Sequence, residues 1–554
     1  MENLFLLLIL LFIAFVIIYY SYRVSKRQEQ YNKDRIKNSY GSASFREYAD
    51  GEYAHIGGYS NNHPSDFRID DITWNDLNMD SIFMDMNYTQ SSAGEEYLYY
   101  LLRNPAVLEE SCEDFERKIR HFGSDAKKRF DLQYALYKCG RTGKYSIYDY
   151  LNNLDIIKDE NFNSDVWLLL MYAVAVFVLF VNLGLGITAI AFLLIYGGIT
   201  YFRKKRRIEP YVTSFSYVFR MINGAKKICA VDEPEISAEQ ERLRELVKEL
   251  NSFVSFSYLI MSPNSGTGNI IEIILDYIRI FFHVDLIKFF QMRNQITIHW
   301  DCIDEILGIM GRLDSIVSVA CYREYIGDWC NPEFSEDNYY AEDIYHPLLV
   351  NPVKNSVSFN KGVLLTGSNA SGKSTMLKTV AVAAVLAQAV NTVPAKKYSA
   401  PRYRVYTSLA LNDDILAGES YYMTEIKSLK RIMDSSRDDK SPILACVDEV
   451  LRGTNTNERI SASYVILKKL SSVNGIIFAA THDLELANLL NDIYDNYHFE
   501  ETINQNDISF EYRILPGIAT TRNAIKLLEI VGYDKDIITE ATRISEASKE
   551  WKFV

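Results

Sequence analysis

A chain of 554 residues is too long for one hydrophobic core and predicts about two to four domains. Hydrophobic residues make up 48% and charged residues 24%, so most of the chain has the composition of a soluble globular protein. The net charge of -13 argues against a broad surface that coats nucleic acid through phosphate contacts, but it leaves room for a small basic region.

The first predicted element is an uncharged apolar run of 17 residues, Leu4 to Tyr20, close to the about 20 residues that span a bilayer. It ends in tyrosines, which favour the membrane interface. A cleaved signal peptide is the alternative, but it needs a basic start and a small-residue cleavage site. Here Glu2 precedes the run and "SYRVSKRQEQ" follows it. We therefore expect an uncleaved membrane anchor over residues 1–22.

The second apolar segment, Val166 to Phe202, has no charged residue over 37 positions. That is too long for one span, and "VNLGLG" interrupts it with Asn182, Gly184 and Gly186. The pattern predicts two membrane helices joined by a tight turn. A buried soluble hairpin is the alternative, and the basic block "RKKRR" at 203–207 argues against it because such blocks flank spans on the cytoplasmic side.

Basic residues after each apolar segment agree on one topology. Arg23, Lys26 and Arg27 follow the first segment, as the basic block follows the second. The N-terminus is predicted to lie outside the cell and residues 21–165 in the cytoplasm. The hairpin is predicted to cross the membrane twice, so that the rest of the chain is again cytoplasmic. We expect a multi-pass protein of the cell membrane whose large soluble parts are cytoplasmic.

A third apolar stretch, "IIEIILDYIRIFFHVDLIKFF" at 270–290, is predicted to be soluble. It carries five charged residues, each costing roughly 2.5 to 3.5 kcal/mol at the centre of a bilayer. The stretch is expected to be one amphipathic helix within a mostly helical region from 210 to 330. The charged residues are Glu272, Asp276, Arg279, Asp285 and Lys288.

Cysteine and histidine are scattered along the chain. The seven cysteines form no CxxC pair, which suits buried thiols in a reducing compartment. The eight histidines show no HxxxH or HExxH spacing, so we expect no dedicated transition-metal site.

The stretch "GSNASGKST", Gly367 to Thr375, predicts a phosphate-binding loop. The apolar strand "KGVLLTG" precedes it and the alanine-rich helix "STMLKTVAVAAVLAQAV" follows it, which is the context that gives a Walker A pattern its meaning. Backbone amides and the helix N-terminus would bind phosphates, while Lys373 reaches the β and γ groups. Ser374 would supply an oxygen to Mg²⁺.

Two further strands end in residues suited to phosphoryl transfer. "PILACVDE" ends in Asp448 and Glu449, 75 positions after Lys373, and "IIFAATHD" delivers His482. Asp448 would hold Mg²⁺, Glu449 would orient and polarise the attacking water, and His482 would sense the γ-phosphate. "LAGESYYMTEI" adds Gly418 and Ser420, a weaker match to a loop that caps a nucleotide bound to a second subunit.

These stretches carry a family resemblance. The quoted motifs, together with "DEVLRGTNT" and "YRILPGIATTRNAIKLLEIVGYDKDII", resemble the ATPase domain of the MutS family of DNA mismatch-repair proteins. The likeness is strong over 340–550. It is loose over 80–330. "IYHPLLVNP" at 344–352 resembles the entry to the domain, "LDSIVSVACYREYIGDWCNP" its connecting helix, and "MNYTQSSAGEEYLYYLLRNP" the start of the helical core.

The resemblance implies an α/β P-loop ATPase of the ABC type, an all-α core or lever region, the cofactors ATP and Mg²⁺, and a homodimer. It assigns Ser374 and Asp448 to Mg²⁺, Lys373 and Glu449 to catalysis, and His482 to sensing hydrolysis. The residues implied to bind the nucleotide are Gly367, Ser368, Asn369, Ala370, Ser371, Gly372, Lys373, Ser374 and Thr375, with Ser420 reaching the partner's nucleotide and Asn351 near the base.

The chain also departs from that family. No room remains before Thr89 for a mismatch-reading domain with its Phe-x-Glu wedge, and the tripeptides at 45–47 and 334–336 are chance matches among 28 phenylalanines. The DNA clamp is not recognisable. The predicted regions are an anchor (1–22), a cytoplasmic region with the start of the helical core (23–165), a hairpin (166–202), a helical lever (203–339) and an ATPase domain (340–554).

Two functions follow from these features. The first is a membrane-anchored ATPase coupled to DNA. The alternative is a mechanochemical membrane protein that acts on a protein partner or on its own spans without DNA.

Overall fold

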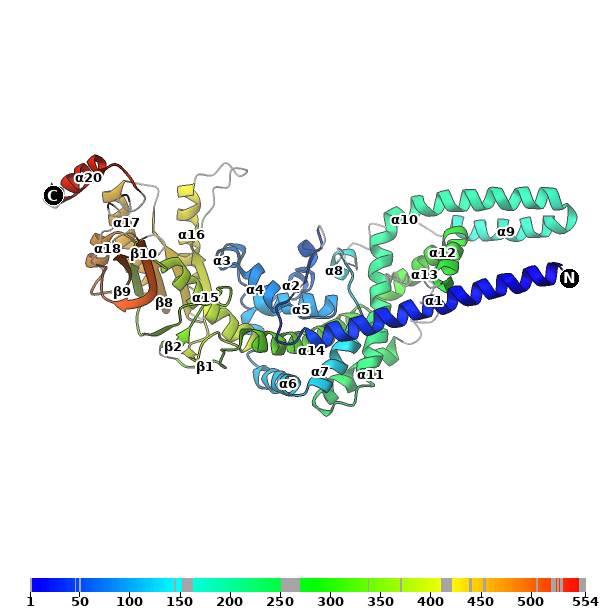
Figure 1. The fold of residues 1–554 in the computed structure, drawn as a ribbon, viewed down its shortest axis with the longest axis horizontal. Helices are drawn as coiled ribbons and strands as arrows, with labels where there is room; N and C mark the ends of the chain where they lie inside the picture. The colour runs from blue at the N-terminus through cyan, green and yellow to red at the C-terminus, as the bar shows by residue number, and fades with distance from the viewer. Residues whose placement is uncertain are drawn as a thin grey trace. The chain divides into compact units, whose positions relative to one another are not determined.

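In a computed structural model, the chain divides into two compact units, which are described here one by one (Figure 1). The first unit takes in residues 1–64, 84–100 and 113–325, and the second takes in 65–83, 101–112 and 326–554. The structure describes residues 2–44, 46–48, 51–143, 146–151, 163–250, 270–336, 338–368, 371–409, 421–437, 441–451, 455–504, 507–519, 525, 528 and 532–547.

Helices make up the regular structure described in the first unit. A single long helix, α1, runs through the predicted anchor, and the side chains of most residues between 2 and 18 lie outside the described ones. The helices that belong to it wholly or in part are α1 (Glu2–Asn38), α2 (Gly58–Asn62), α4 (Met79–Met86), α5 (Ser92–Arg103), α6 (Cys112–Ser124), α7 (Ala126–Tyr137), α8 (Ile147–Leu151), α9 (Asn163–Val181), α10 (Leu183–Ile228), α11 (Ser237–Glu249), α12 (Ile270–Phe282), α13 (Val284–Ile298) and α14 (Trp300–Ile326), of which α4 begins in the second unit and α5 ends there.

The predicted apolar hairpin is a pair of helices that lie side by side, α9 and the first part of α10 (Figure 1). Asn182 forms the turn, and its side chain accepts a hydrogen bond of 3.1 Å from the backbone N–H of Leu185, so it caps the start of α10. By length and composition alone, α9 and Leu183–Arg206 could each cross a membrane, and only 22% and 17% of these segments is buried in the protein.

The stretch at 270–290 forms two helices and not the single helix expected from its apolar pattern. His283 separates α12 from α13 in a left-handed conformation, with φ of 56°. Its Nδ1 lies 2.7 Å from Asp165 and its Nε2 lies 2.8 Å from the carbonyl oxygen of Gly197, both on the hairpin. Contacts with residues far away in the sequence therefore fix the break, which local periodicity could not show.

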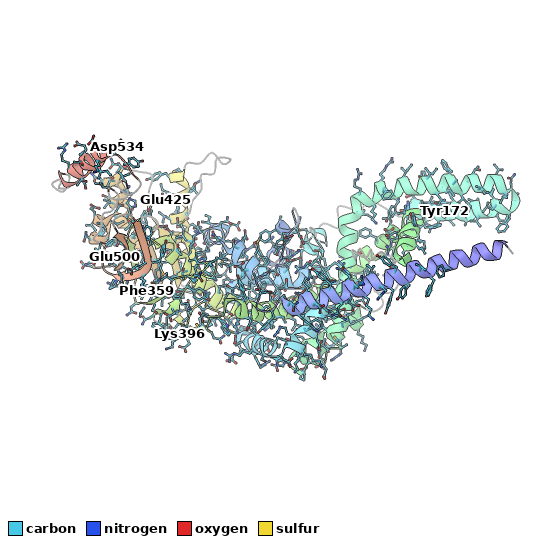
Figure 2. All side chains as sticks on the ribbon, viewed as in Figure 1. Tyr172, Phe359, Lys396, Glu425, Glu500 and Asp534 are labelled. Atoms are coloured by element: carbon cyan, nitrogen blue, oxygen red, sulfur yellow. The ribbon has the colours of Figure 1, made fainter. Side chains whose placement is uncertain are left out.

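The hairpin packs on this helix pair through apolar and polar side chains. Tyr172 of α9, labelled in Figure 2, packs its ring against Phe282 of α12, with ring centroids 4.9 Å apart. Tyr201 of α10 donates a hydrogen bond of 2.9 Å to the buried carboxylate of Asp285 on α13. Lys204 lies 2.8 Å from Asp165. The hairpin is thus joined to α12 by an aromatic contact and to α13 by a hydrogen bond, while the Lys204–Asp165 ion pair ties α10 to α9.

A buried carboxylate organises the start of α5. Asp314 of α14 accepts hydrogen bonds from the backbone N–H groups of Gln90 and Ser91 and from the hydroxyl of Ser91. These contacts cap the N-terminus of α5, where backbone N–H groups lack partners within the helix. Gly94 allows the close approach, because a Cβ there would lie 2.2 Å from Oδ2 of Asp314.

The second unit contains two sheets. The larger has the strand order β10-β9-β4-β8-β7-β6, in which β9 to β6 are parallel and β10 is an antiparallel edge. The smaller has the order β1-β5-β2-β3. The strands are β1 (Glu333–Phe334), β2 (Tyr339–Ile344), β3 (Asn355–Phe359), β4 (Val363–Thr366), β5 (Lys397–Ala400), β6 (Arg404–Ser408), β7 (Ile443–Asp448), β8 (Gly475–Ala480), β9 (Asp495–Asn504) and β10 (Asp507–Pro516).

Helices cover both faces of the larger sheet. Ala445 and Val447 of β7 face a core formed with α16, α17 and α18, while Cys446 faces the other way and meets Leu377 of α15. Such near-continuous apolar strands are typical of a parallel sheet that is buried on both sides. The helices of this unit are α3 (Asp71–Asp76), α15 (Lys373–Val390), α16 (Tyr421–Ser435), α17 (Thr456–Leu470), α18 (Leu484–Leu489) and α20 (Lys535–Ala547).

Helix α3 covers the edge strand β6, although it lies far away in the sequence. Asp76 accepts hydrogen bonds from the hydroxyl of Thr407 at 2.7 Å and from the backbone N–H of Leu409 at 2.9 Å. The backbone N–H of Thr407 also donates to the hydroxyl of Thr73 at 3.2 Å. Edge strands left open invite pairing with other chains, and this helix closes one of them.

Candidate active site

Three neighbouring parallel strands deliver the predicted site residues to one edge of the larger sheet. β4 leads into Gly367, β7 ends in Asp448, and β8 leads to His482. The backbone N–H of Glu449 donates to the carbonyl of Ala480 at 2.9 Å, which ties the end of β7 to the end of β8. Ligands of open α/β sheets bind outside such carboxyl ends, so the sheet gathers these residues at the expected place.

The phosphate-loop residues lie between β4 and α15. Gly367 and Gly372 have φ of 141° and 111°, which side chains with a Cβ rarely adopt. The ammonium group of Lys373 donates to the carbonyl oxygens of Gly367 and Ser368 at 2.7 and 2.8 Å. The side chain of Lys373 is therefore folded back over its own phosphate loop, and its ammonium group bonds to the backbone of that loop.

Ser374 and Asp448 meet across the mouth of this loop. The hydroxyl of Ser374, in the first turn of α15, donates a hydrogen bond to Oδ2 of Asp448. A hydroxyl and a carboxylate are oxygen donors of the kind that Mg²⁺ prefers beside nucleotide phosphates. The two residues assigned to the metal thus come from separate elements and converge on one point.

Glu449 and His482 form a second pair beside them. Glu449 has φ of 51°, an uncommon conformation outside glycine that clusters at functional sites. Nδ1 of His482 lies 3.2 Å from Oε1 of Glu449, and this contact raises the pKa of His482 above its ordinary value. Asp483 pairs with Arg459 through two hydrogen bonds of 2.7 and 3.0 Å, which anchors the chain directly after the histidine.

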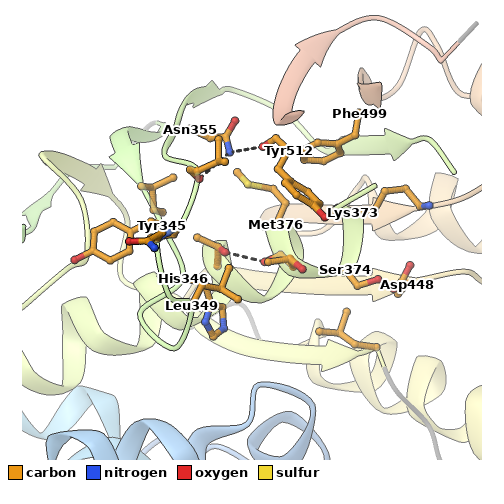
Figure 3. Close-up of a pocket in the computed structure, with 18 of the residues that line it drawn as sticks. Tyr345, His346, Leu349, Asn355, Lys373, Ser374, Met376, Asp448, Phe499 and Tyr512 are labelled. Carbon is orange, nitrogen blue, oxygen red and sulfur yellow. Dashed lines mark hydrogen bonds between the residues drawn. The ribbon is translucent and has the colours of Figure 1, made fainter. Parts of the chain in front are cut away.

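These residues open onto a pocket of about 620 Å³, shown in Figure 3. Asn351 lines it together with residues of the phosphate loop. The lining residues include Tyr345, His346, Leu349, Val350, Asn351, Asn355, Ser368, Gly372, Lys373, Ser374, Thr375, Met376, Thr379, Asp448, Glu449, Phe499 and Tyr512.

The sequence analysis assigned no role to the aromatic side of this pocket. Tyr512 sits at an irregularity between Phe510 and Ile514 in the pairing of β10 with β9, with φ of 53°. Asn355 holds this bulge, because its amide group donates to the carbonyl of Tyr512 at 3.0 Å and accepts from the N–H of Ile514 at 2.9 Å (Figure 3). The position of Tyr512 thus depends on a bulge that no local pattern reveals.

His346 is another lining residue to which the sequence analysis gave no role, although it lies in the quoted stretch "IYHPLLVNP". The side chain is buried, and burial together with the nearby charge of Lys378 lowers the pKa of His346 to about 4. Its Nδ1 accepts a hydrogen bond of 3.3 Å from the backbone N–H of Leu348. A neutral imidazole therefore lines the pocket at physiological pH.

Three of the predicted nucleotide-binding residues, Asn369, Ala370 and Ser420, lie outside the described residues. Of the two chance tripeptides, Phe45 also lies outside them. Phe334 lies in β1, where the guanidinium of Arg402 is 3.7 Å from the centre of its ring.

Comparison with known proteins identifies a known type of domain in the C-terminal part of the chain. Residues 363–549 match the family model described as MutS domain V. This part of the chain is therefore a MutS domain V ATPase, with the mixed sheets of an ABC-like P-loop domain, and the chain joins it to a large helical region. The ATPase predicted from the sequence is confirmed, and such a domain uses ATP and Mg²⁺ in general.

Curated proteins with the same kind of domain are similar over about half of the chain. The human protein named "MutS protein homolog 4" is 30% identical over 287 residues, which is 48% of this chain and 30% of that protein. "DNA mismatch repair protein MutS" of Natronomonas pharaonis is 28% identical over 268 residues, covering 46% and 31%. The protein of that name from Thermotoga maritima is 28% identical over 269 residues, covering 46% and 33%. The chain spans about a third of the length of these relatives.

Proposed function

We propose that the pocket beside the phosphate loop, which Asp448, Glu449 and Tyr512 also line, binds ATP with Mg²⁺ and hydrolyses it, and that this hydrolysis drives the function of the whole chain. The observation that carries the proposal is the contact between Ser374 and Asp448 at the mouth of the phosphate loop. It brings both Mg²⁺-type donors of a P-loop enzyme to one point beside the pocket.

Each side chain has a distinct task in this proposal. Lys373 exchanges the carbonyl oxygens of Gly367 and Ser368 for phosphate oxygens when the nucleotide enters. Ser374 and Asp448 would hold Mg²⁺, which neutralises charge that develops on the phosphate oxygens. Glu449 orients and polarises the attacking water, and His482 keeps the carboxylate of Glu449 in place.

The aromatic end of the pocket suits the base of the nucleotide. Phe499 and Tyr512 line it together with the neutral His346, and flat rings of this kind stack on a purine. Asn351 adds amide donors and acceptors at this end. The pocket thus combines charged side chains for the phosphates of ATP with aromatic and amide side chains for its base.

Two substitutions separate binding from hydrolysis. Lys373→Ala is expected to lower ATP affinity, because it removes ground-state contacts to the phosphates. Glu449→Gln is expected to leave affinity intact and lower the turnover rate by about 100-fold or more, because it acts on the water alone. The measurements are fluorescent-nucleotide binding and phosphate release, with the exposed Lys397→Ala as a matched control. Normal hydrolysis by Glu449→Gln would overturn the assignment.

We further propose that the ATPase works as a homodimer, in which the loop carrying Ser420 completes the partner's nucleotide site. A MutS domain V over residues 363–549 supports this, because the stretch "LAGESYYMTEI" matches the nucleotide-capping loop in the family resemblance. The relatives named for DNA mismatch repair support DNA as the structure on which the dimer acts.

We also propose that the chain is anchored in the cell membrane by its N-terminal segment and by the hairpin, with the ATPase in the cytoplasm. Large apolar side chains of α9 and α10 are exposed, among them Phe177, Phe180, Leu183 and Phe192. A water-soluble surface rarely carries such a continuous apolar patch. By contrast α15, which has similar apolar length, is 83% buried within its own unit.

A second function competes with action on DNA. The buried contacts of Asp165 with His283 and of Tyr201 with Asp285 join the hairpin to α12 and α13, and this connection favours an ATPase that moves membrane helices. The net charge of -13 favours the same alternative. A salt titration of DNA binding by the detergent-solubilised protein separates the two. If the protein contacts DNA phosphates, its affinity for DNA falls steeply as the salt concentration rises. If it shows no saturable DNA binding even at low salt, the mechanochemical function is supported instead.

A further inference from the structure

Three side chains with different metal-binding atoms meet in the first unit, where α11 ends and α14 begins. Glu249 is the last residue of α11, His299 lies between α13 and α14, and Cys302 is in the first turn of α14. Their ligand atoms all lie within 4.8 Å of one another. Nδ1 of His299 is 4.0 Å from Oε1 of Glu249, and the Cys302 thiol hydrogen-bonds to the same carboxylate.

The backbone places this group before any ion binds. The N–H of His299 donates to the carbonyl of Gln295 at 3.1 Å, and its own carbonyl accepts from the N–H of Ile303 at 3.1 Å. His299 and Cys302 are three positions apart at the start of a helix, so their side chains share one side. Arg242 of α11 donates two hydrogen bonds, of 2.6 and 2.7 Å, to the carboxylate of Glu305 on α14. These bonds hold the two helices together.

The surroundings favour a positive ion. Besides Glu249, the carboxylates of Glu305 and Asp301 lie close enough to Cys302 for their negative charges to act on it. A divalent cation placed among these groups would be attracted by the same charges and would stabilise the thiolate. The side chain of Glu249 is 57% exposed, so an ion can enter from solvent without unfolding of the helices.

We propose that Glu249, His299 and Cys302 form a binding site for a transition-metal ion of the zinc class. Carboxylate oxygen, imidazole nitrogen and thiolate sulfur are each ligand atoms that zinc accepts, and with three protein ligands water takes the fourth tetrahedral position. Ligand bonds of about 2.0 to 2.3 Å require the three atoms to approach to within about 4 Å of one another, a small adjustment from the present spread. On binding, the S–H bond of Cys302 breaks, its proton passes to solvent, and the sulfur bonds to the ion.

Such a site would clamp the end of α11 to the start of α14. It differs from the nucleotide site in position and in chemistry, since it contains sulfur and nitrogen ligands that Mg²⁺ does not prefer. The sequence analysis expected no transition-metal site because it searched for CxxC, HxxxH and HExxH. The pattern here is His-x-x-Cys with a carboxylate from a helix 50 positions earlier.

Cobalt is the probe that tests the site, because Co²⁺ bound to a thiolate gives a sulfur-to-metal charge-transfer band. The full-length protein, without an affinity tag and stripped of metal, is titrated with Co²⁺ in the absence of nucleotide. We expect one Co²⁺ per chain with that band, and loss of the band when Zn²⁺ is added. Cys302→Ser is expected to abolish the band, and His299→Ala and Glu249→Gln to weaken Co²⁺ affinity by more than about 10-fold each.

Two control variants separate this site from other metal-binding groups. Cys229→Ser removes another partly exposed thiol of the same unit and is expected to leave the band unchanged. Lys373→Ala is expected to leave it unchanged as well, which excludes the nucleotide site. A band that survives Cys302→Ser, or equal Co²⁺ affinity in all variants, would overturn the proposal. If Cys302→Ser does not fold, the affinities of the other two variants decide it.

Discussion

His482 and Glu449 are joined across the ends of two neighbouring strands, with 3.2 Å between Nδ1 and Oε1. The two residues are 33 positions apart: Glu449 directly follows β7, and His482 comes two positions after the end of β8. The histidine that was predicted to sense phosphate is therefore also a partner of the residue that was predicted to act on water.

This contact has a pH dependence whose sign can be stated. The pairing with Glu449 raises the pKa of His482, so the charged pair is complete below the ordinary pKa of about 6.5 and is lost as pH rises through the raised value. Glu449→Gln is expected to lower the pKa of His482. Diethyl pyrocarbonate modifies only neutral imidazole, so the rate at residue 482, followed by mass spectrometry against pH, gives the midpoint. His55, which pairs with Asp149, serves as the internal control. An unchanged midpoint at residue 482 would contradict the pairing.

His346 predicts a loss of stability in acid. Its folded-state pKa of about 4 lies below the ordinary value, so its contribution to stability is complete above about pH 6.5 and is lost as pH falls toward 4. The full effect is roughly 3 kcal/mol, because one pKa unit corresponds to about 1.4 kcal/mol. His346→Gln, which cannot take up a proton, is expected to show a smaller fall in melting temperature between pH 7.5 and 5. His482→Gln is the control, and equal acid slopes in His346→Gln and the parent would refute the prediction.

Gly94 and Asp314 predict a strong coupling in the helical unit. Gly94→Ala places a methyl group 2.2 Å from Oδ2 of Asp314, which must leave its hydrogen bonds at the start of α5. The expected destabilisation is about 3 kcal/mol, because hydrogen bonds to a buried charged group are lost. In an Asp314→Ala background the same change is expected to cost far less, as a double-mutant cycle of melting temperatures would show. Gly123→Ala, whose Cβ would meet only ordinary contact at 3.9 Å, is the matched control. Additive effects would rule out the coupling.

The hairpin predicts a definite topology in the membrane. Gly184 lies in the first turn of α10, and a Cβ there would meet ordinary contact at 3.6 Å, so Gly184→Cys is expected to fold. On intact cells, an impermeant thiol reagent is expected to label Gly184→Cys and to spare Arg203→Cys in the basic block. The parent protein gives the background from its native cysteines. Labelling of Arg203→Cys alone would reverse the topology, and labelling of neither on intact cells but both after lysis would remove the hairpin from the membrane.

The proposed dimer predicts complementation between two inactive variants. Lys373→Ala and Ser420→Ala homodimers are each expected to hydrolyse ATP poorly, because every site contains one defect. In a heterodimer, one site collects both defects and the other is intact, so about half of the parental activity should return if each variant alone is inactive. Phosphate release by purified, co-expressed heterodimers measures this. Parental activity of Ser420→Ala alone, or no recovery although both variants dimerise, would place the whole site within one chain.

Local sequence predicts some of these features well and others poorly. The strand, loop and helix around Gly367 to Thr375 could be predicted because their residues are neighbours in the chain. The break at His283 could not, because Asp165 and Gly197 hold it across 118 and 86 positions. Tyr512 was missed because a bulge in β10 sets its direction. Its partner Asn355 lies 157 positions earlier.

The cover of β6 by α3 has a consequence for how the chain is made. Asp76 and its partner Thr407 are 331 positions apart, so at about 5 to 20 residues per second the ribosome needs roughly 20 to 60 s between them. During that time Trp74 and Leu77, which are fully enclosed in the finished protein, have no sheet to pack against. The edge strand β6 can be covered only when it binds helix α3, a segment that left the ribosome long before β6 was made. Contacts between residues so far apart in the sequence slow folding. Until β6 is made, the exposed apolar residues of α3 are a site where chaperones can bind and where misfolding can begin.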